Sequence, residues 1–235
     1  MARCNRVKAA IFDIGATLVT GPPVAPNKVI AALMDGVTPA EVASIIMTTD
    51  LDCAEAVCSA LESRFRALSE RAVEGITELW NSQSSAASEI DGAVRTVLAI
   101  KERGLKIGLL SDIWNPYYES VEKALPDVIE AADSIVLSCR TGARKPDTEN
   151  FRRALAEIGV KPDEAVMIGD TYTHDIRPAL EIGMSAVWVL ARPEREAESI
   201  IGILNGNCPA PTAAVASITE VAEIIGLMVG ENDGH

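Results

Sequence analysis

The stretch AAIFDIGATLV, Ala9 to Val19, decides the fold of this chain. Its first four residues are apolar and end at Asp13, which predicts a buried strand with a carboxylate at its carboxyl end. Open α/β sheets bind their ligands outside the carboxyl ends of the strands, so Asp13 is expected where chemistry is done. Gly15 follows two residues later and brings no side chain to the same place.

The composition describes a globular protein with a substantial core. The chain has 235 residues, 48% of them hydrophobic, which is enough for one domain and a smaller appendage. Its formal net charge of −13 opposes the phosphate backbone of nucleic acid and anionic lipid surfaces. No apolar stretch reaches the length of a membrane-spanning helix. Nucleic acid and membranes are therefore excluded as expected partners, and a small metabolite fits the acidic surface better than a polyanion.

The cysteines are scattered and form no CxxC pair of the kind that zinc sites use. They are Cys4, Cys53, Cys58, Cys139 and Cys208. An odd number without close spacing favours reduced thiols, and so a cytoplasmic protein.

Short β-rich runs alternate with helical patterns through most of the chain, which predicts an α/β fold with a parallel sheet covered by helices. The expected strands are 8–12, 106–110, 134–137, 165–168 and 186–190. The helices between them are expected from Asp91 to Gly104, from Asp147 or Thr148 to Gly159, and from His174 to Gly183. A last strand at 213–215 and a helix at 219–228 complete the pattern.

Residues 21–87 break the alternation, because they carry helical signals and no strand signal. Thr38 to Glu41 and Asp52 to Glu55 have the pattern of capping boxes, and Ser69 can cap a third helix. The ends of this region, GPPVAP and NSQSSAAS, have the composition of linkers. An insertion after the first strand overhangs the ligand-binding edge of the sheet. We therefore expect a helical cap domain at 21–87 on a core domain made of 1–20 and 88–235.

Polar side chains follow other predicted strands as Asp13 follows the first. They are Ser111 and Asp112 after KIGLL, Lys145 in ARKPD, and Asp170 and Asp175 in VMIGDTYTHD. In a parallel sheet these positions converge on one edge. Paired acids there suit Mg²⁺, which prefers oxygen ligands. A carboxylate nucleophile, an anion-binding hydroxyl, a compensating cation and a metal site together indicate phosphoryl transfer through an aspartyl-phosphate.

The sequence resembles the haloacid dehalogenase superfamily of hydrolases. FDIGATL matches the first motif of this superfamily, LLSD the second, RKPD the third and IGDTYTHD the fourth. The resemblance covers almost the whole chain, including a helical cap of the C1 type inserted after the first motif. It implies a Rossmannoid, three-layer parallel sheet and a magnesium-dependent phosphatase that acts on a small phosphorylated metabolite.

The resemblance also implies roles for individual residues. Asp13 looks like the nucleophile and a metal ligand, and Lys145 like the lysine that steadies nucleophile and phosphate. Ser111 resembles the phosphate-binding hydroxyl, with Asp112 beside it on the substrate side. Asp170 matches a magnesium ligand. Asp175 matches the second acid of the fourth motif, which in relatives supports the metal site or the lysine.

Gly15 departs from the family pattern. Phosphatases of the family usually have a second Asp at this position, which protonates the leaving alkoxide and later activates water. Losing a positioned acid or base typically costs about 10²- to 10⁴-fold in rate. The same position has a second role in the family, since its backbone carbonyl is a metal ligand, and glycine keeps this carbonyl.

Three interpretations follow from this departure. The protein is a phosphatase whose leaving group needs little protonation, or one that borrows an acid such as His174 or Asp112. Alternatively its chemistry resembles that of dehalogenases, which commonly have Tyr at this position and a fourth motif unlike IGDTYTHD, or that of phosphonatases, which add an essential cap lysine. Lys28 is the sole lysine of the expected cap. In the third interpretation the scaffold binds phosphate or a partner without turnover. Trp114, Asn115, Tyr117 and Tyr118 could face the cap, although packing in the core is the simpler interpretation.

Overall fold

The computed structural model describes residues 7–230, whose main sheet has six parallel strands in the order β5-β4-β1-β6-β7-β8. The strands are β1 (Ala9–Phe12), β4 (Lys106–Ser111), β5 (Ser134–Leu137), β6 (Ala165–Gly169), β7 (Ser185–Val189) and β8 (Ala213–Val215). β1 lies at the centre of the sheet, because it pairs with β4 on one side and with β6 on the other. The predicted α/β fold with a parallel sheet is confirmed, including its last strand.

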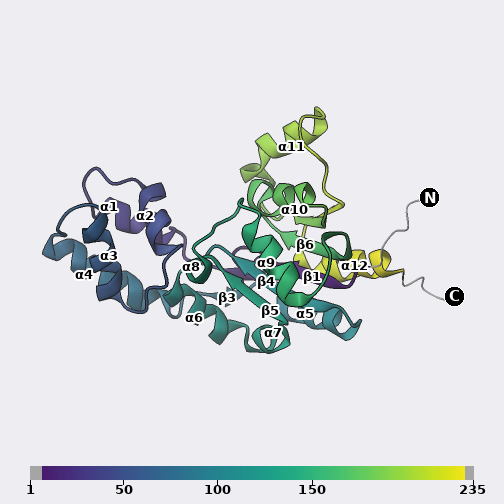
Figure 1. Ribbon diagram of the computed structural model, residues 1–235, viewed down its shortest axis with the longest axis horizontal. Coiled ribbons are helices and arrows are strands. Elements are labelled where there is room, and N and C mark those ends of the chain that lie inside the picture. Colours follow the sequence, from purple (N-terminus) through teal and green to yellow (C-terminus); the bar gives the residue numbers. More distant parts are fainter. Residues whose placement is uncertain (1–6, 231–235) are drawn as a thin grey trace.

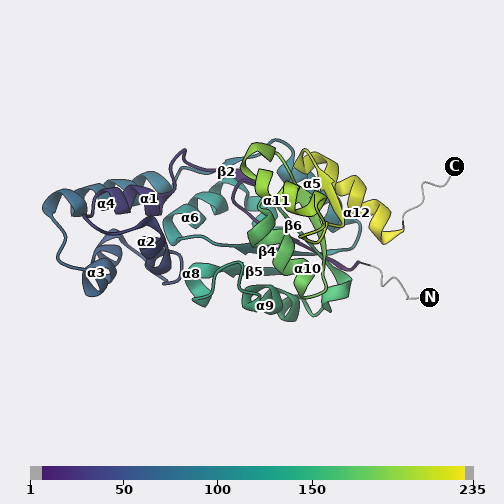
Figure 2. The same ribbon diagram turned by 90° about the horizontal axis from the view of Figure 1, so that it is seen from above.

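β1 is buried along its whole length because its side chains alternate between two apolar layers. Ala10 and Phe12 belong to one cluster, and Ala9 and Ile11 to the other. The first cluster is covered by α5 (Ala93–Glu102), α6 (Asn115–Ala124), α7 (Pro126–Ala131) and α12 (Val221–Val229), and the second by α9 (Glu149–Ile158), α10 (Arg177–Glu181) and α11 (Ala197–Leu204). Figure 2 shows α5 and α12 on one side of the sheet and α9 on the other, so the sheet is the middle of three layers.

Four further helices lie between β1 and β4 in the sequence, and we call them the inserted helices. They are α1 (Pro26–Ala32), α2 (Pro39–Ile46), α3 (Ala54–Arg64) and α4 (Glu70–Gln83). Ile30, Ile46, Leu61 and Ile76 supply one residue from each helix to a separate apolar cluster, which Trp114 joins from the loop after β4. Figure 1 shows the inserted helices together at one end of the molecule, next to α6 and the short helix α8 (Ser138–Thr141).

The starts of these helices test the capping predictions. The Thr38 box is confirmed: the Thr38 hydroxyl accepts from the Glu41 N–H at 3.3 Å, and Glu41 accepts from the Thr38 N–H at 2.9 Å. The Asp52 box is wrong, because burial of the apolar face of α3 sets its first residue at Ala54, and Cys53 becomes the cap.

Ser69 caps α4 as predicted, and its hydroxyl accepts from the Ala72 N–H at 3.2 Å. Asp91 does not cap α5. The chain turns at Gly92 with φ 79°, a left-handed conformation that favours glycine, and α5 begins only after it. Glu89 instead accepts a hydrogen bond from the Val94 N–H at 3.0 Å.

The structure contains elements that the sequence did not indicate. A two-stranded antiparallel ribbon, β2 (Val19–Thr20) with β3 (Ser88–Glu89), joins the chain where it enters and leaves the inserted helices. Strands this short carry no alternation signal. α6 and α7 connect β4 to β5, and each has a proline in its first turn, Pro116 and Pro126.

Four of the five cysteines, Cys53, Cys58, Cys139 and Cys208, are free thiols, while Cys4 lies outside the described residues. The cytoplasmic location inferred from reduced thiols stays a prediction. No helix formed by residues 7–230 has both the length and the apolar content needed to cross a membrane.

Candidate functional site

Asp13 is the first residue after β1, and its backbone N–H donates to the carbonyl of Ile168 on β6 at 2.9 Å. The residue is only 5% exposed. Burial raises the pKa of the Asp13 carboxyl to about 6, although the charge of Lys145 opposes this rise. Two hydroxyls lie close to the carboxylate, Ser111 at 3.5 Å from Oδ1 and Thr17 at 3.4 Å from Oδ2. The central strand thus fixes a carboxylate at the edge of the sheet.

Lys145 is buried and bridges two carboxylates. Its Nζ lies 2.6 Å from Oδ1 of Asp13 and 2.6 Å from Oδ1 of Asp175. Burial alone would lower the pKa of Lys145, but the charges of Asp13 and Asp175 raise it above its ordinary value. The side chain is therefore a fixed ammonium at neutral pH, because two acids compensate its loss of hydration.

Asp170 follows β6 directly, and its carboxylate meets a cation that the sequence analysis did not single out. Oδ2 is paired with the guanidinium of Arg192, and Oδ1 accepts from the Thr171 hydroxyl at 3.2 Å. Burial raises the pKa of Asp170, and the nearby charge of Asp13 adds to the rise. Arg192 lies three residues after β7, so it too reaches the carboxyl edge of the sheet.

Asp175 lies in a single π-helical turn, Tyr172–Ile176, and is 1% exposed. Its Oδ1 contacts Lys145, and its Oδ2 accepts from the Thr171 N–H at 3.0 Å. Gly169 makes this approach possible, since a Cβ atom there would lie 2.5 Å from Cβ of Asp175. Because both oxygens of Asp175 already have partners, we expect this carboxylate mainly to orient Lys145.

Asp13, Asp170 and Asp175 form a group that could hold a metal ion. One carboxylate oxygen from each lies within 4.8 Å of the others. These three acids face two cationic groups, those of Lys145 and Arg192, so the cluster retains an excess of negative charge. An all-oxygen donor set with excess negative charge fits a hard divalent cation.

Asp112 anchors the loop that carries Lys145. Its Oδ1 accepts from the backbone N–H of Lys145 at 3.0 Å, and its Oδ2 lies 3.4 Å from Nε of Arg144. Ser111, the last residue of β4, is buried with its hydroxyl beside Asp13. Both residues lie at the edge where the sequence predicted them, with Ser111 facing Asp13 and Asp112 facing the Lys145 loop.

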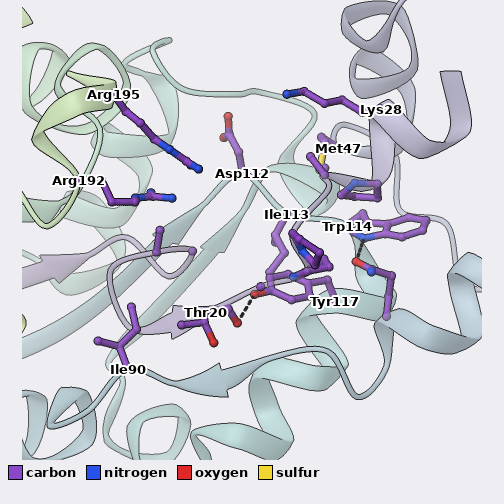
Figure 3. Close-up of a pocket in the computed structure, with 18 of the residues that line it drawn as sticks. Thr20, Lys28, Met47, Ile90, Asp112, Ile113, Trp114, Tyr117, Arg192 and Arg195 are labelled. Carbon is purple, nitrogen blue, oxygen red and sulfur yellow. Dashed lines mark hydrogen bonds between the residues drawn. The ribbon is translucent and has the colours of Figure 1, made fainter. Parts of the chain in front are cut away.

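A cavity of about 860 Å³ opens between the sheet edge and the inserted helices. Gly15, Thr20 and Tyr117 line its floor near the β2–β3 ribbon, and Lys28 and Arg195 line it from the inserted helices and the loop after β7. Figure 3 shows the side chains of Lys28 and Arg195 on opposite sides of Asp112. Neither cation has an ion-pair partner among residues 7–230.

The other candidates from the sequence are less well placed. His174 is half-buried, its Nδ1 lies 3.0 Å from the Thr173 hydroxyl, and it is not among the residues that line the cavity. Burial lowers its pKa, so the imidazole favours its neutral form. Lys28 is exposed at the cavity, where its ammonium is hydrated.

Comparison with known proteins gives the family. The protein-family model described as haloacid dehalogenase-like hydrolase matches residues 7–183. The glyceraldehyde 3-phosphate phosphatase of Pyrococcus furiosus is 31% identical over 114 residues, which are 48% of this chain and 47% of that protein. The chain therefore spans about half the length of the first curated relatives that it matches.

Solved structures with the same fold include enzymes of two chemistries. A HAD (haloacid dehalogenase-like) phosphatase from Thermococcus onnurineus is 22% identical with a TM-score of 0.61, and the match covers 94% of this chain and 98% of that one. A 2-haloacid dehalogenase from Pseudomonas syringae pv. Tomato DC3000 is 17% identical with a TM-score of 0.63, covering 94% and 99%. These likenesses show the fold alone. Because the family model matches most of the chain, the chain belongs to the haloacid dehalogenase-like hydrolases.

Proposed function

We propose that this hydrolase is a phosphatase that acts on a small phosphorylated metabolite through an aspartyl-phosphate on Asp13. The observation that carries the proposal is the buried ammonium of Lys145, held 2.6 Å from Asp13, which precedes by two positions the cavity-lining residue Gly15. An anionic nucleophile attacks an anionic phosphoryl group only where a fixed cation offsets their repulsion. The relative named glyceraldehyde 3-phosphate phosphatase supports the same reaction class.

In the proposed reaction, a carboxylate oxygen of Asp13 attacks phosphorus and the leaving-group oxygen departs. Water then hydrolyses the aspartyl-phosphate and restores Asp13. Lys145 remains charged throughout because Asp175 also holds it. The Ser111 hydroxyl, 3.5 Å from Asp13, is placed to donate a hydrogen bond to a phosphoryl oxygen.

We propose Mg²⁺ as the resident cation. The carboxylates of Asp13 and Asp170 and the carbonyl of Gly15 would hold it, with Asp175 in the same acidic group. When bound, Mg²⁺ would neutralise charge on the phosphoryl group. The donor set fits, since every group offered is oxygen and Mg²⁺ prefers oxygen ligands.

We further propose that residues 21–87 act as a cap domain over the core of 1–20 and 88–235, because the cavity lies between the inserted helices and the sheet. Lys28 and Arg195 bring unpaired positive charge to this cavity in a chain of net charge −13. An anionic substrate explains why cations gather there. A phosphonatase-like role is less well supported, because a nucleophilic lysine needs a desolvated site and Lys28 is exposed.

The proposal is tested by assaying alkyl, aryl and acyl phosphates with Mg²⁺, and again with EDTA in its place. We expect metal-dependent turnover that Asp13→Asn abolishes, since an amide oxygen cannot serve as the nucleophile. Asp127→Asn, on the exposed surface of α7, is the matched control and should leave the rate unchanged.

Two outcomes would overturn this function. Turnover that survives undiminished in Asp13→Asn would remove the nucleophile assignment. If no phosphate is turned over and halide is released from 2-haloacids, the dehalogenase-like interpretation is favoured. If no phosphate is turned over and phosphate only binds, the non-catalytic interpretation is favoured.

A further inference from the structure

The site lacks an evident proton donor for the leaving group. Gly15 has no side chain, and a Cβ atom added to it would meet no atom within 4 Å, so the place where relatives carry an acid is open cavity. An alkoxide is a poor leaving group, and its departure without a proton is slow. A donor for this step must come from another residue that lines the same cavity.

Few residues that line the cavity can donate a proton. Asp112 accepts hydrogen bonds with one oxygen and faces Arg144 with the other, as an ionised carboxylate does. The guanidinium groups of Arg192 and Arg195 do not release protons in proteins. Lys28 extends from α1, and no hydrogen bond or ion pair within residues 7–230 fixes its exposed ammonium in the cavity. The phenol of Tyr117 is the acid of this cavity that a hydrogen bond holds in place.

Tyr117 lies on α6 and lines the same cavity as Gly15. Its hydroxyl donates to the carbonyl of Thr20 at 3.0 Å, the bond drawn in Figure 3. Thr20 is the next residue after Val19, and Val19 pairs directly with Gly15 in an isolated bridge. The hydroxyl also closes on the backbone of Gly21, where an added Cβ atom would be 2.7 Å from it. The phenol is therefore hydrogen-bonded to Thr20, the residue that follows the bridge partner of Gly15.

The protonation state of Tyr117 suits this position. Burial raises its pKa to about 12, and the charge of Asp13 adds to the rise, so the hydroxyl keeps its proton at neutral pH. An aliphatic alcohol is a weaker acid than a phenol, so transfer of this proton to a departing alkoxide is downhill. The only bond the hydroxyl makes with residues 7–230 goes to a carbonyl in a solvent-accessible setting, and rotation about the C–O bond frees it.

Resting on the proposed phosphatase function, we propose that Tyr117 supplies the proton for the leaving group in place of the acid missing at position 15. As the bond from Asp13 to phosphorus forms and the bond from phosphorus to the leaving oxygen breaks, the phenolic proton moves to that oxygen and releases a neutral alcohol. The tyrosinate then takes a proton from the water that attacks phosphorus in the aspartyl-phosphate. The phenol, Asp13 and inorganic phosphate result, so protons and electrons balance.

The test is Tyr117→Phe, with kcat/KM measured on glycerol phosphate and on p-nitrophenyl phosphate. For each ester, kcat/KM reports only the steps up to release of the leaving group. We expect a loss of about 10²- to 10⁴-fold on the alkyl ester. The aryl ester should change by less than about 3-fold, because nitrophenolate leaves without a proton. A plot of log kcat/KM against leaving-group pKa should become steeper in the variant.

Tyr118→Phe is the matched control, because Tyr118 is the next residue on α6 and its ring centroid lies 4.9 Å from Cζ of Arg140. This variant should leave kcat/KM unchanged on both esters. An equal loss on both esters would overturn the proposal and make Tyr117 a support for the ribbon. Retention of full activity on the alkyl ester would also overturn it. Activity of Tyr117→Phe on the aryl ester shows that the variant is folded and that the phosphatase function stands. Failure of the wild-type protein on both esters would instead contradict the phosphatase function.

Discussion

A side chain at position 15 would project into open space, because an added Cβ atom on Gly15 meets nothing within 4 Å. Gly15→Asp should therefore fold and place a carboxyl group beside the leaving-group oxygen. We expect kcat/KM for alkyl phosphates to rise by about 10-fold or more, and for aryl phosphates to change little. The gain should be largest in the Tyr117→Phe background, where no other donor is left.

Gly15→Asn is the control for this prediction, because it has the same size and cannot move a proton. If Asn and Asp gave the same gain, the side chain would be acting by filling space. If neither changed the rate on alkyl esters, the leaving group would bind away from position 15.

Residue by residue, the sequence predicted which polar side chains meet at one edge of the sheet wherever such a side chain follows a strand, and the roles assigned to them stay predictions. Asp13, Ser111 and Asp170 come directly after or at the end of buried runs, and the parallel sheet brings them together. Arg192 obeys the same rule three residues after β7, and that spacing could have revealed it. The resemblance left open whether Asp175 supports the metal site or the lysine, because its contact with Lys145 depends on a local π-helical turn that the residue pattern does not indicate.

The turn that carries Asp175 is packed so closely on β6 that it tolerates no side chain at Gly169. Gly169→Ala should push Asp175 away from Lys145, because the new Cβ atom would lie 2.5 Å from Cβ of Asp175. We expect a loss of about 1–3 kcal/mol in the free energy of unfolding. Misplacement of Lys145 should also lower kcat on the order of 10²-fold. Urea denaturation and steady-state kinetics measure the two effects.

Gly108→Ala on β4 is the matched control. Its added Cβ atom would lie 2.8 Å from Cδ1 of Ile158 and 3.1 Å from Cγ1 of Ile11, so it crowds apolar side chains of the same sheet instead of Asp175. We expect a similar loss of stability with kcat retained. An equal loss of kcat in both variants would mean that crowding anywhere in the sheet disturbs the site, and that Asp175 has no special part.

At the level of elements, strands buried on both faces were predictable because their apolar runs are continuous. The elements that the sequence missed depend on contacts from elsewhere in the chain. β2 and β3 are two residues each and exist because Val19 and Thr20 meet Glu89 and Ser88. Similarly, Glu89 satisfies the first turn of α5, whereas the local pattern pointed to Asp91. Caps that use only their own turn, at Thr38 and Ser69, were predicted correctly.

For the whole molecule, we expect the distribution of charge to affect how the proposed anionic substrate is captured. A net charge of −13 repels anions at long range, while Lys28 and Arg195 attract them at the cavity. Replacing both by Gln should raise KM for phosphorylated substrates roughly 3- to 10-fold, as exposed charges contribute about 1 kcal/mol or less each. The effect should shrink as salt screens these charges.

Lys161→Gln is the control for that pair, because this exposed lysine lies before β6 at the other end of the strand. Its replacement also removes a positive charge, but from a position that does not line the cavity. A rise in KM per charge as large as that of the cavity variant would show that only the total charge of the protein matters.

Trp114 connects the sheet to the inserted helices. Its backbone belongs to the loop after β4, yet its side chain is buried among the inserted helices and donates to Gln83 at 3.3 Å. If the inserted helices move as the proposed cap, we expect the movement either to expose this ring or to displace α6 and Tyr117 with it. Cap movement and placement of the phenol would then be linked, and by reciprocity a substrate that engages Tyr117 would hold the inserted helices against the sheet.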